Sequence, residues 1–208
     1  MSAQPAIGAE DRATSNGHVL RPATAADLPA CARIWRESIN HYTAPMNLPE
    51  VPDDLAAILR LYAHLHTTDP ATFVVAERTE GRGGAPTIDA FAVVVVRGSL
   101  RFLSMLFVLP GAQGRGLGRA LLAAVLPDEG PNGDVSRATS TDSAQPISNG
   151  LYASLGIVPR IPLLRLVGLP ERPDAFPDLP DGIAVVPFDE IEAGVDGLGS
   201  AALAAELA

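Results

Sequence analysis

A strand that runs into a glycine-rich turn and then into a helix constrains this chain most. The apolar run Leu100 to Leu109 is followed by the segment 113–118 (Gln-Gly-Arg-Gly-Leu-Gly) and by a helix predicted from Leu117 to Leu126. The first N–H groups of a helix lack intrahelical partners and lie at the positive end of its dipole, so the turn can receive a phosphate or pyrophosphate. Glycine lets ligand oxygens approach the backbone, and Arg115 or Arg119 can add charge-assisted hydrogen bonds.

Two well-known phosphate-binding loops do not match this turn. A Walker loop requires Gly-Lys-Ser/Thr, and the chain contains no lysine. A Rossmann turn requires a third glycine where Arg119 stands. A glycine-rich turn that only begins an ordinary helix is the structural alternative, and the turn by itself leaves both interpretations open.

The hydrophobic pattern predicts a mixed α/β fold. Two amphipathic helices come first, and the apolar strands that follow need helices on both faces of their sheet. The predicted elements give a three-layer domain. They are strand 19–22, a helix from Leu28 to about His41-Tyr42, helix 53–65, strands 72–76, 90–97 and 100–109, helix 117–126, strand 135–141, helix 146–155 and strand 161–167, with a hairpin at Gly98-Ser99.

Composition indicates a globular protein. Of 208 residues, 47% are apolar and 19% are charged, which supplies a packed core and argues against global disorder. No apolar run approaches the roughly 20 residues of a membrane span, and the first residues lack the pattern of a signal peptide. We therefore expect a cytoplasmic protein without membrane contact. Arginine without lysine in an alanine-rich chain indicates a GC-rich bacterial genome.

The net charge and the cysteine content limit the kinds of ligand, disulfide and metal site that this chain can have. The net charge of -9 argues against a nucleic-acid binder, whose affinity would come from phosphate neutralisation, and favours a cationic or neutral small substrate. The single cysteine, Cys31, excludes an intrachain disulfide and a cysteine-based metal site. We predict that Cys31 is a small core residue and that the chain has no metal site.

Three segments, in the right order, resemble the GNAT acetyltransferase superfamily. Residues 113–118 are similar to its Gln/Arg-x-x-Gly-x-Gly/Ala acyl-CoA loop, preceded by the strand exit Val108-x-Pro110. Residues 20–24 (Leu-Arg-Pro-Ala-Thr) resemble its opening, and residues 151–157 (Leu-Tyr-Ala-Ser-Leu-Gly-Ile) resemble its Leu-Tyr-x-x-Leu-Gly-Phe pattern. The resemblance covers residues 18–168.

This resemblance implies an α/β three-layer GNAT-like fold with a mixed, splayed central sheet. The strands that separate would be Leu100 to Leu109 and Val135 to Thr141, with the pantetheine arm of acetyl-CoA held between them. The implied activity is an acetyl-CoA-dependent N-acetyltransferase in which a small amine attacks the thioester directly. The implied cofactor-binding residues are Phe107, Val108, Gln113, Gly114, Arg115, Gly116, Leu117, Gly118, Arg119, Gln145 and Asn149.

The resemblance also implies a catalytic acid, Tyr152, which would protonate the departing thiolate. A positioned phenol can donate that proton, whereas a core tyrosine satisfying one hydrogen bond is the structural alternative. The chain departs from the family at two places. Gln145 stands where an asparagine is common, while Asn149 lies closer to Tyr152. Leu100 to Val108 carries no Asp or Glu, so no general base is assigned, and a non-catalytic acyl-CoA-binding or interaction module is the alternative function.

Polar residues nearest the acceptor side are Glu37, His41, Tyr42 and Asp142. Glu37 can equally belong to a solvated helix face. His41 can be a helix C-terminal residue favoured by the dipole, and Asp142 can be a cap.

Outside the GNAT-like segment the chain divides into three parts. Residues 1–17 are predicted to be a flexible leader and 169–182 a proline-rich linker. Residues 183–208 predict a strand and a helix whose start echoes His18 to Thr24, as if a second GNAT copy began there. An ordinary C-terminal strand and helix, packed on the same domain or across a homodimer, is the alternative.

Overall fold

The computed structural model describes residues 14–15, 17–78, 87–126 and 135–164. The chain divides into one unit of residues 1–158 and a second of residues 159–208, and the fold described here is that of the first. The predicted linker and C-terminal strand and helix lie outside the described residues, as does most of the predicted leader. No helix within the described segments is long and apolar enough to cross a membrane.

A mixed sheet forms the centre of the first unit, and its described strands follow the order β1-β2-β3-β4-β5-β6. Each strand is antiparallel to its neighbour except β5 and β6, which are parallel. The predicted hairpin is confirmed between β4 and β5. The strands are β1 (Thr14–Ser15), β2 (His18–Pro22), β3 (Phe73–Arg78), β4 (Thr87–Arg97), β5 (Leu100–Val108) and β6 (Ser136–Thr139).

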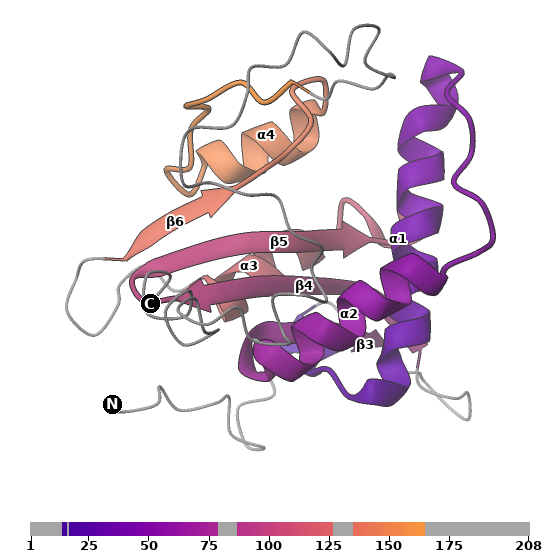
Figure 1. The fold of residues 1–208 in the computed structure, drawn as a ribbon, viewed down its shortest axis with the longest axis horizontal. Coiled ribbons are helices and arrows are strands. Elements are labelled where there is room, and N and C mark those ends of the chain that lie inside the picture. The colour runs from indigo at the N-terminus through magenta and orange to yellow at the C-terminus, as the bar shows by residue number, and fades with distance from the viewer. Residues whose placement is uncertain (1–13, 16, 79–86, 127–134, 165–208) are drawn as a thin grey trace, which may run out of the picture. The chain divides into compact units, whose positions relative to one another are not determined.

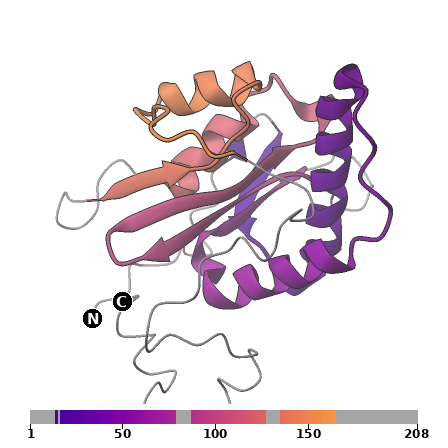
Figure 2. The same ribbon diagram turned by 45° about the horizontal axis from the view of Figure 1, so that its top comes forward.

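Helices cover both faces of this sheet, which confirms the predicted three-layer arrangement. In Figure 1, α2 lies in front of the sheet and α3 behind it, and Figure 2 shows the same layers from a turned view. The α-helices are α1 (Leu28–Thr43), α2 (Ala56–Thr68), α3 (Leu117–Val125) and α4 (Pro146–Ala153). The 3-10 turns are η1 (Ala25–Asp27), η2 (Ala44–Met46), η3 (Pro70–Thr72) and η4 (Pro110–Ala112).

Alternate residues of the strands supply two separate cores, as the pleat of a sheet requires. Phe73 and Phe91 pack with α1 and α2, around the buried Tyr62. Val74 and Ala92 pack with α3 and α4 on the other face. Cys31 is fully buried in the first core, and burial raises the pKa of its thiol to about 12, as expected of an unreactive core residue.

A buried carboxylate fixes the end of the sheet from which the glycine-rich turn departs. Asp89 on β4 is 2% exposed and accepts hydrogen bonds from His18 Nε2 (2.8 Å) and from Arg78 Nε and Nη2 (2.8 and 2.7 Å). Burial alone would raise the pKa of Asp89, but these donors hold it below its ordinary value. The Asp89 carbonyl also accepts the N–H of Leu109, so the same residue anchors the exit of β5.

Several predicted boundaries differ from the structure, and three of these differences have a bearing on the fold or the site. The strand predicted at 161–167 is wrong for residues 161–164, which form no strand, because Pro162 cannot donate to a sheet ladder; residues 165–167 lie outside the described range. Helix α2 begins at Ala56 because Asp54 Oδ1 accepts the Ala56 N–H and forms a turn there. Strand β6 ends at Thr139, two residues earlier than predicted.

Candidate functional site

Strands β5 and β6 part after only four paired residues. Their register runs from Leu100 opposite Ser136 to Leu103 opposite Thr139, where Thr139 Oγ1 donates to the Leu103 carbonyl at 2.9 Å. Strand β5 continues to Val108 without a β6 partner, and Figure 1 shows β6 turning away. The splay that the resemblance implied is confirmed, and it opens after Leu103 on β5 and Thr139 on β6.

A bulge in β5 lies where the two strands separate. The register against β4 passes from Val93 opposite Met105 to Val94 opposite Leu103, so Ser104 has no opposite residue. Bulges increase the local twist and bend the strand that carries them, which is consistent with the departure of β6 at this point. Nothing in the sequence indicated the bulge, because it depends on the register between two strands.

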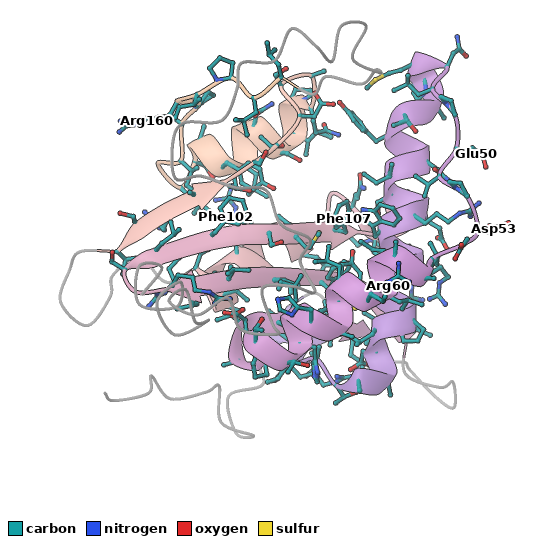
Figure 3. The ribbon with its side chains drawn as sticks, in the orientation of Figure 1. Glu50, Asp53, Arg60, Phe102, Phe107 and Arg160 are labelled. Carbon is teal, nitrogen blue, oxygen red and sulfur yellow. The ribbon has the colours of Figure 1, made fainter. Side chains whose placement is uncertain are left out.

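The open part of β5 is held firmly at its end. The Val108 carbonyl accepts hydrogen bonds from Ser38 Oγ on α1 (3.2 Å) and from Gln113 Nε2 (3.0 Å). The Phe107 ring stacks on Phe91, with ring centroids 5.8 Å apart, and Figure 3 shows Phe107 where β5 approaches α1. Nothing in the sequence indicated the contact between Ser38 and β5, because it depends on how α1 packs against the strand.

The glycine-rich turn leaves the start of α3 without a side-chain cap. Gly114 and Gly116 have left-handed φ angles of +74° and +80°, and Gly116 occupies the N-cap position. A serine, threonine or aspartate there would normally satisfy the first N–H groups, which glycine leaves available to an anion. Leu117 is buried in the core, so its contribution to any ligand would come from its backbone.

Two further features surround this turn. Gly118 packs against α4 so closely that a Cβ atom there would lie 3.4 Å from Leu151 Cδ2. A cleft of about 520 Å³ adjoins the turn, and Arg115, Arg78 and Glu37 are among the side chains that line it. Arg119, in the first turn of α3, is exposed. The arginines place positive charge beside the uncapped helix end.

Gln145 and Asn149 shape the start of α4. Gln145 Oε1 accepts the Ile147 N–H at 3.3 Å, which makes Gln145 the N-cap of this helix. Asn149 Nδ2 donates to the backbone carbonyls of Asp142, Ser143 and Gln145. These bonds give both residues a structural task, and the cofactor contacts expected of them stay predictions.

Tyr152 lies on α4 at the edge of the second core and is 8% exposed. Its hydroxyl makes no hydrogen bond within the described residues, and burial raises the pKa of Tyr152. The phenol therefore keeps its proton at neutral pH. This arrangement is compatible both with a proton donor and with the alternative of a core tyrosine.

Three of the four acceptor-side residues, Glu37, His41 and Asp142, lie as their structural alternatives predict, and Tyr42 differs from them. Glu37 is exposed on α1 and lies 3.5 Å from Arg33 one turn away, as expected for a solvated helix face. His41 is exposed in the last turn of α1. Asp142 Oδ1 accepts the Ala144 N–H at 2.8 Å, which is the predicted capping role, whereas the Tyr42 hydroxyl oxygen is buried without a hydrogen bond within the described residues.

Comparison with known proteins decides the family. The model of the acetyltransferase (GNAT) family matches residues 35–157, more than half of the chain. The chain belongs to the GNAT family. A search of curated protein sequences gives no match to this GNAT chain.

Solved structures share the GNAT fold at low identity. A Pyrococcus horikoshii protein assigned as an acetyltransferase matches with a TM-score of 0.53 and 15% identity over 71% of this chain and 45% of that one. The PaiA N-acetyltransferase from Thermoplasma acidophilum, solved in complex with coenzyme A, gives 0.51 and 14% over 65% and 86%. A GCN5-related N-acetyltransferase from Sphaerobacter thermophilus gives 0.52 and 18% over 73% and 43%. The chain thus spans less than half of the first and third of these proteins.

Proposed function

We propose that this chain is an acetyl-CoA-dependent N-acetyltransferase that acetylates a small amine. The observation that carries the proposal is the uncapped start of α3, reached through two left-handed glycines, next to the unpaired half of β5. Family membership and the coenzyme A bound to the similar Thermoplasma protein support the choice of ligand.

The residues present fit two parts of coenzyme A, its pyrophosphate and its pantetheine arm. The N–H groups at the start of α3 would hold the pyrophosphate, with Arg115 and Arg119 supplying charge. The unpaired edge of β5 near Phe107 and Val108 offers backbone groups to the amides of the pantetheine arm, as a further strand would. The Val108 carbonyl already has two donors, so its N–H and the backbone before it are the better candidates.

When bound, acetyl-CoA supplies an acyl thioester that is activated toward an amine. The Tyr152 hydroxyl would hold the proton that the thiolate needs on departure. Burial raises the pKa of this phenol above its ordinary value near 10, so Tyr152 would enter the reaction protonated, as a proton donor must. The chain's backbone N–H groups on β5 would stabilise negative charge on the carbonyl oxygen.

The test combines binding with turnover. Calorimetry should detect coenzyme A binding to the full chain, and acetyl-CoA mixed with a panel of small amines should release free thiol. Absence of coenzyme A binding would refute the assignment of the site. Binding without release of thiol for any amine would refute the proposed activity.

One observation favours a second candidate, a non-catalytic acyl-CoA-binding module. The unpaired half of β5 presents no carboxylate that could take a proton from the amine, and Tyr152 is mostly enclosed in the core. For this alternative we expect coenzyme A binding with no acetyl transfer, or with transfer that is insensitive to Tyr152→Phe.

A further inference from the structure

The last turn of α1 places a tyrosine toward the open end of β5. Ser38 donates to the Val108 carbonyl, so the side of α1 that carries Ser38 faces the end of β5. Tyr42 follows four residues later and therefore lies on that same side, one helical turn further along. It extends the contact from the strand end toward the region that β6 leaves open.

The Tyr42 hydroxyl lies beside the Asp142 carboxylate without completing a well-aligned hydrogen bond to it. Its oxygen is buried and makes no hydrogen bond within the described residues. A buried polar oxygen without a partner costs free energy, and such groups in native proteins call for an explanation such as a bound ligand. The neighbouring carboxylate is that of Asp142. Burial raises the pKa of Tyr42, and the Asp142 carboxylate raises it further.

Asp142 reaches the same place from the other side of the open region. The connection from β6 to α4 carries Asp142, whose carboxylate lies close enough to the Tyr42 hydroxyl near the end of α1 to raise its pKa. Its backbone is fixed, because its carbonyl accepts the Gln145 N–H (3.2 Å) and Asn149 Nδ2 (3.1 Å). One carboxylate oxygen accepts the Ala144 N–H, which also restricts the side chain.

The charges around this carboxylate leave it without a cation. Within the described residues, no arginine or histidine forms an ion pair with Asp142. On α1, Glu37 lies 3.5 Å from Arg33, and His41 is exposed. A held anion beside a buried phenol oxygen that accepts no hydrogen bond matches an ammonium group, which can donate to both.

We propose that Tyr42 and Asp142, here called the acceptor pair, bind the ammonium group of the amine to be acetylated. The Asp142 carboxylate would accept one N–H and supply the opposite charge. The Tyr42 oxygen would accept a second N–H, and the alkyl part of the amine would extend away from the pair. This inference rests on the proposed function, since it names the acceptor class of that site as a protonated primary amine.

Tyrosine NMR can observe the acceptor pair directly. The chain contains three tyrosines, so a protein labelled at the tyrosine ring carbon next to the hydroxyl gives three signals, assigned with single Tyr→Phe variants. The probes are n-butylamine, spermidine and the uncharged 1-butanol, each titrated with and without saturating coenzyme A. We expect the amines to shift the Tyr42 signal while the signal of the buried Tyr62 stays in place, and 1-butanol to shift neither. No Tyr42 shift with either amine would overturn the proposal.

Variants separate recognition from folding. Asp142→Asn keeps the oxygen that accepts the Ala144 N–H, so the turn should persist. Asp54→Asn is its matched control, because Asp54 accepts the Ala56 N–H in the same kind of turn at the start of α2. Asp142→Asn should abolish the Tyr42 shift and raise the KM for the amine about 10-fold, as expected for the loss of one charge-assisted contact. Asp54→Asn should change neither.

Two more variants complete the test. Tyr42→Phe should raise the amine KM about 5-fold, whereas Tyr62→Phe should leave it unchanged. Asp142→Glu should recover part of the loss seen with Asp142→Asn. The affinity for coenzyme A should stay within about 2-fold in every variant. An unchanged amine KM in both Asp142→Asn and Tyr42→Phe would overturn the acceptor pair but would not affect the proposed function. A wild-type chain that fails to bind coenzyme A would refute the proposed function itself.

Discussion

The turn before α3 and the acceptor pair present different kinds of groups to a ligand. The turn offers the first backbone N–H groups of α3, which all lie within one short stretch of chain. The acceptor pair offers two side chains that lie 100 residues apart in the sequence, on α1 and after β6. A backbone site depends on local conformation, which glycines at left-handed φ angles determine. A side-chain site depends on how distant elements pack.

This difference separates what each region can recognise. Backbone N–H groups at a helix start bind any suitably placed phosphate. Binding of the same cofactor therefore requires glycines in the turn and few specific side chains. Side chains from α1 and from the β6–α4 connection can change without disturbing that cofactor. The acceptor side is therefore where we expect substrate specificity to be determined.

The strongest test of the backbone site is Gly116→Val. A β-branched residue at a φ of +80° is strained, and its side chain would lie over the N–H groups, so coenzyme A binding should be lost altogether. Calorimetry measures the binding, and circular dichroism shows whether the fold persists. Gly150→Val is the control, since Gly150 lies on α4 with open space around it.

A second substitution at the same position guards against misfolding. Gly116→Asn keeps a residue that tolerates the left-handed region, and its amide oxygen can itself cap the first N–H groups of α3. It should weaken coenzyme A binding in a stable protein. Undiminished affinity in a folded Gly116→Val or Gly116→Asn protein would show that the ligand does not use this helix start.

Tyr152→Phe tests whether a side chain outside the acceptor pair takes part in the chemistry. We expect kcat to fall about 10²-fold with little change in coenzyme A affinity, because a positioned acid typically contributes at least that much. Tyr62→Phe removes the hydroxyl of another buried tyrosine and should leave kcat unchanged. Equal kcat values for Tyr152→Phe and the wild type would assign Tyr152 to the core.

Asp89 anchors the exit of β5 through the Leu109 N–H, and its removal should affect stability rather than either ligand. Asp89→Asn loses charge-assisted bonds from Arg78 and His18, and we expect the free energy of unfolding to fall by about 2 kcal/mol. The pKa of Asp89 is depressed in the folded protein, so its contribution is complete above its ordinary pKa near 4 and is lost as the pH falls through the folded value.

Urea unfolding at several pH values checks this prediction. The difference between the wild type and Asp89→Asn should be largest near pH 6 to 7 and should shrink below about pH 4. A difference that is constant from pH 7 to pH 3 would contradict the role assigned to the ionised carboxylate.

The sequence predicted local features well and distant ones poorly. The turn, the hairpin at Gly98-Ser99 and the layered order follow from neighbouring residues, and the structure confirms them. The bulge at Ser104 depends on register against β4, and the approach of Tyr42 to Asp142 depends on the packing of α1, so neither has a local signature. The strand predicted from the apolar run 161–167 is wrong for residues 161–164. The prediction followed the hydrophobicity of this run, although Pro162 cannot donate a hydrogen bond to a neighbouring strand.

The smallest effect we expect comes from Arg115→Ala. This variant tests whether the turn binds phosphate through side chains as well as through its backbone. One exposed charge-assisted contact to phosphate should be worth about 5-fold in coenzyme A affinity, and it should be absent for a pantetheine fragment that lacks the phosphates. Arg60, which Figure 3 shows on α2, provides the control Arg60→Ala. Calorimetry with both ligands gives the comparison. Equal losses of affinity for coenzyme A and for pantetheine would mean that Arg115 does not contact phosphate. The site before α3 would then bind phosphate through its backbone alone, which would make its difference from the side-chain acceptor pair sharper.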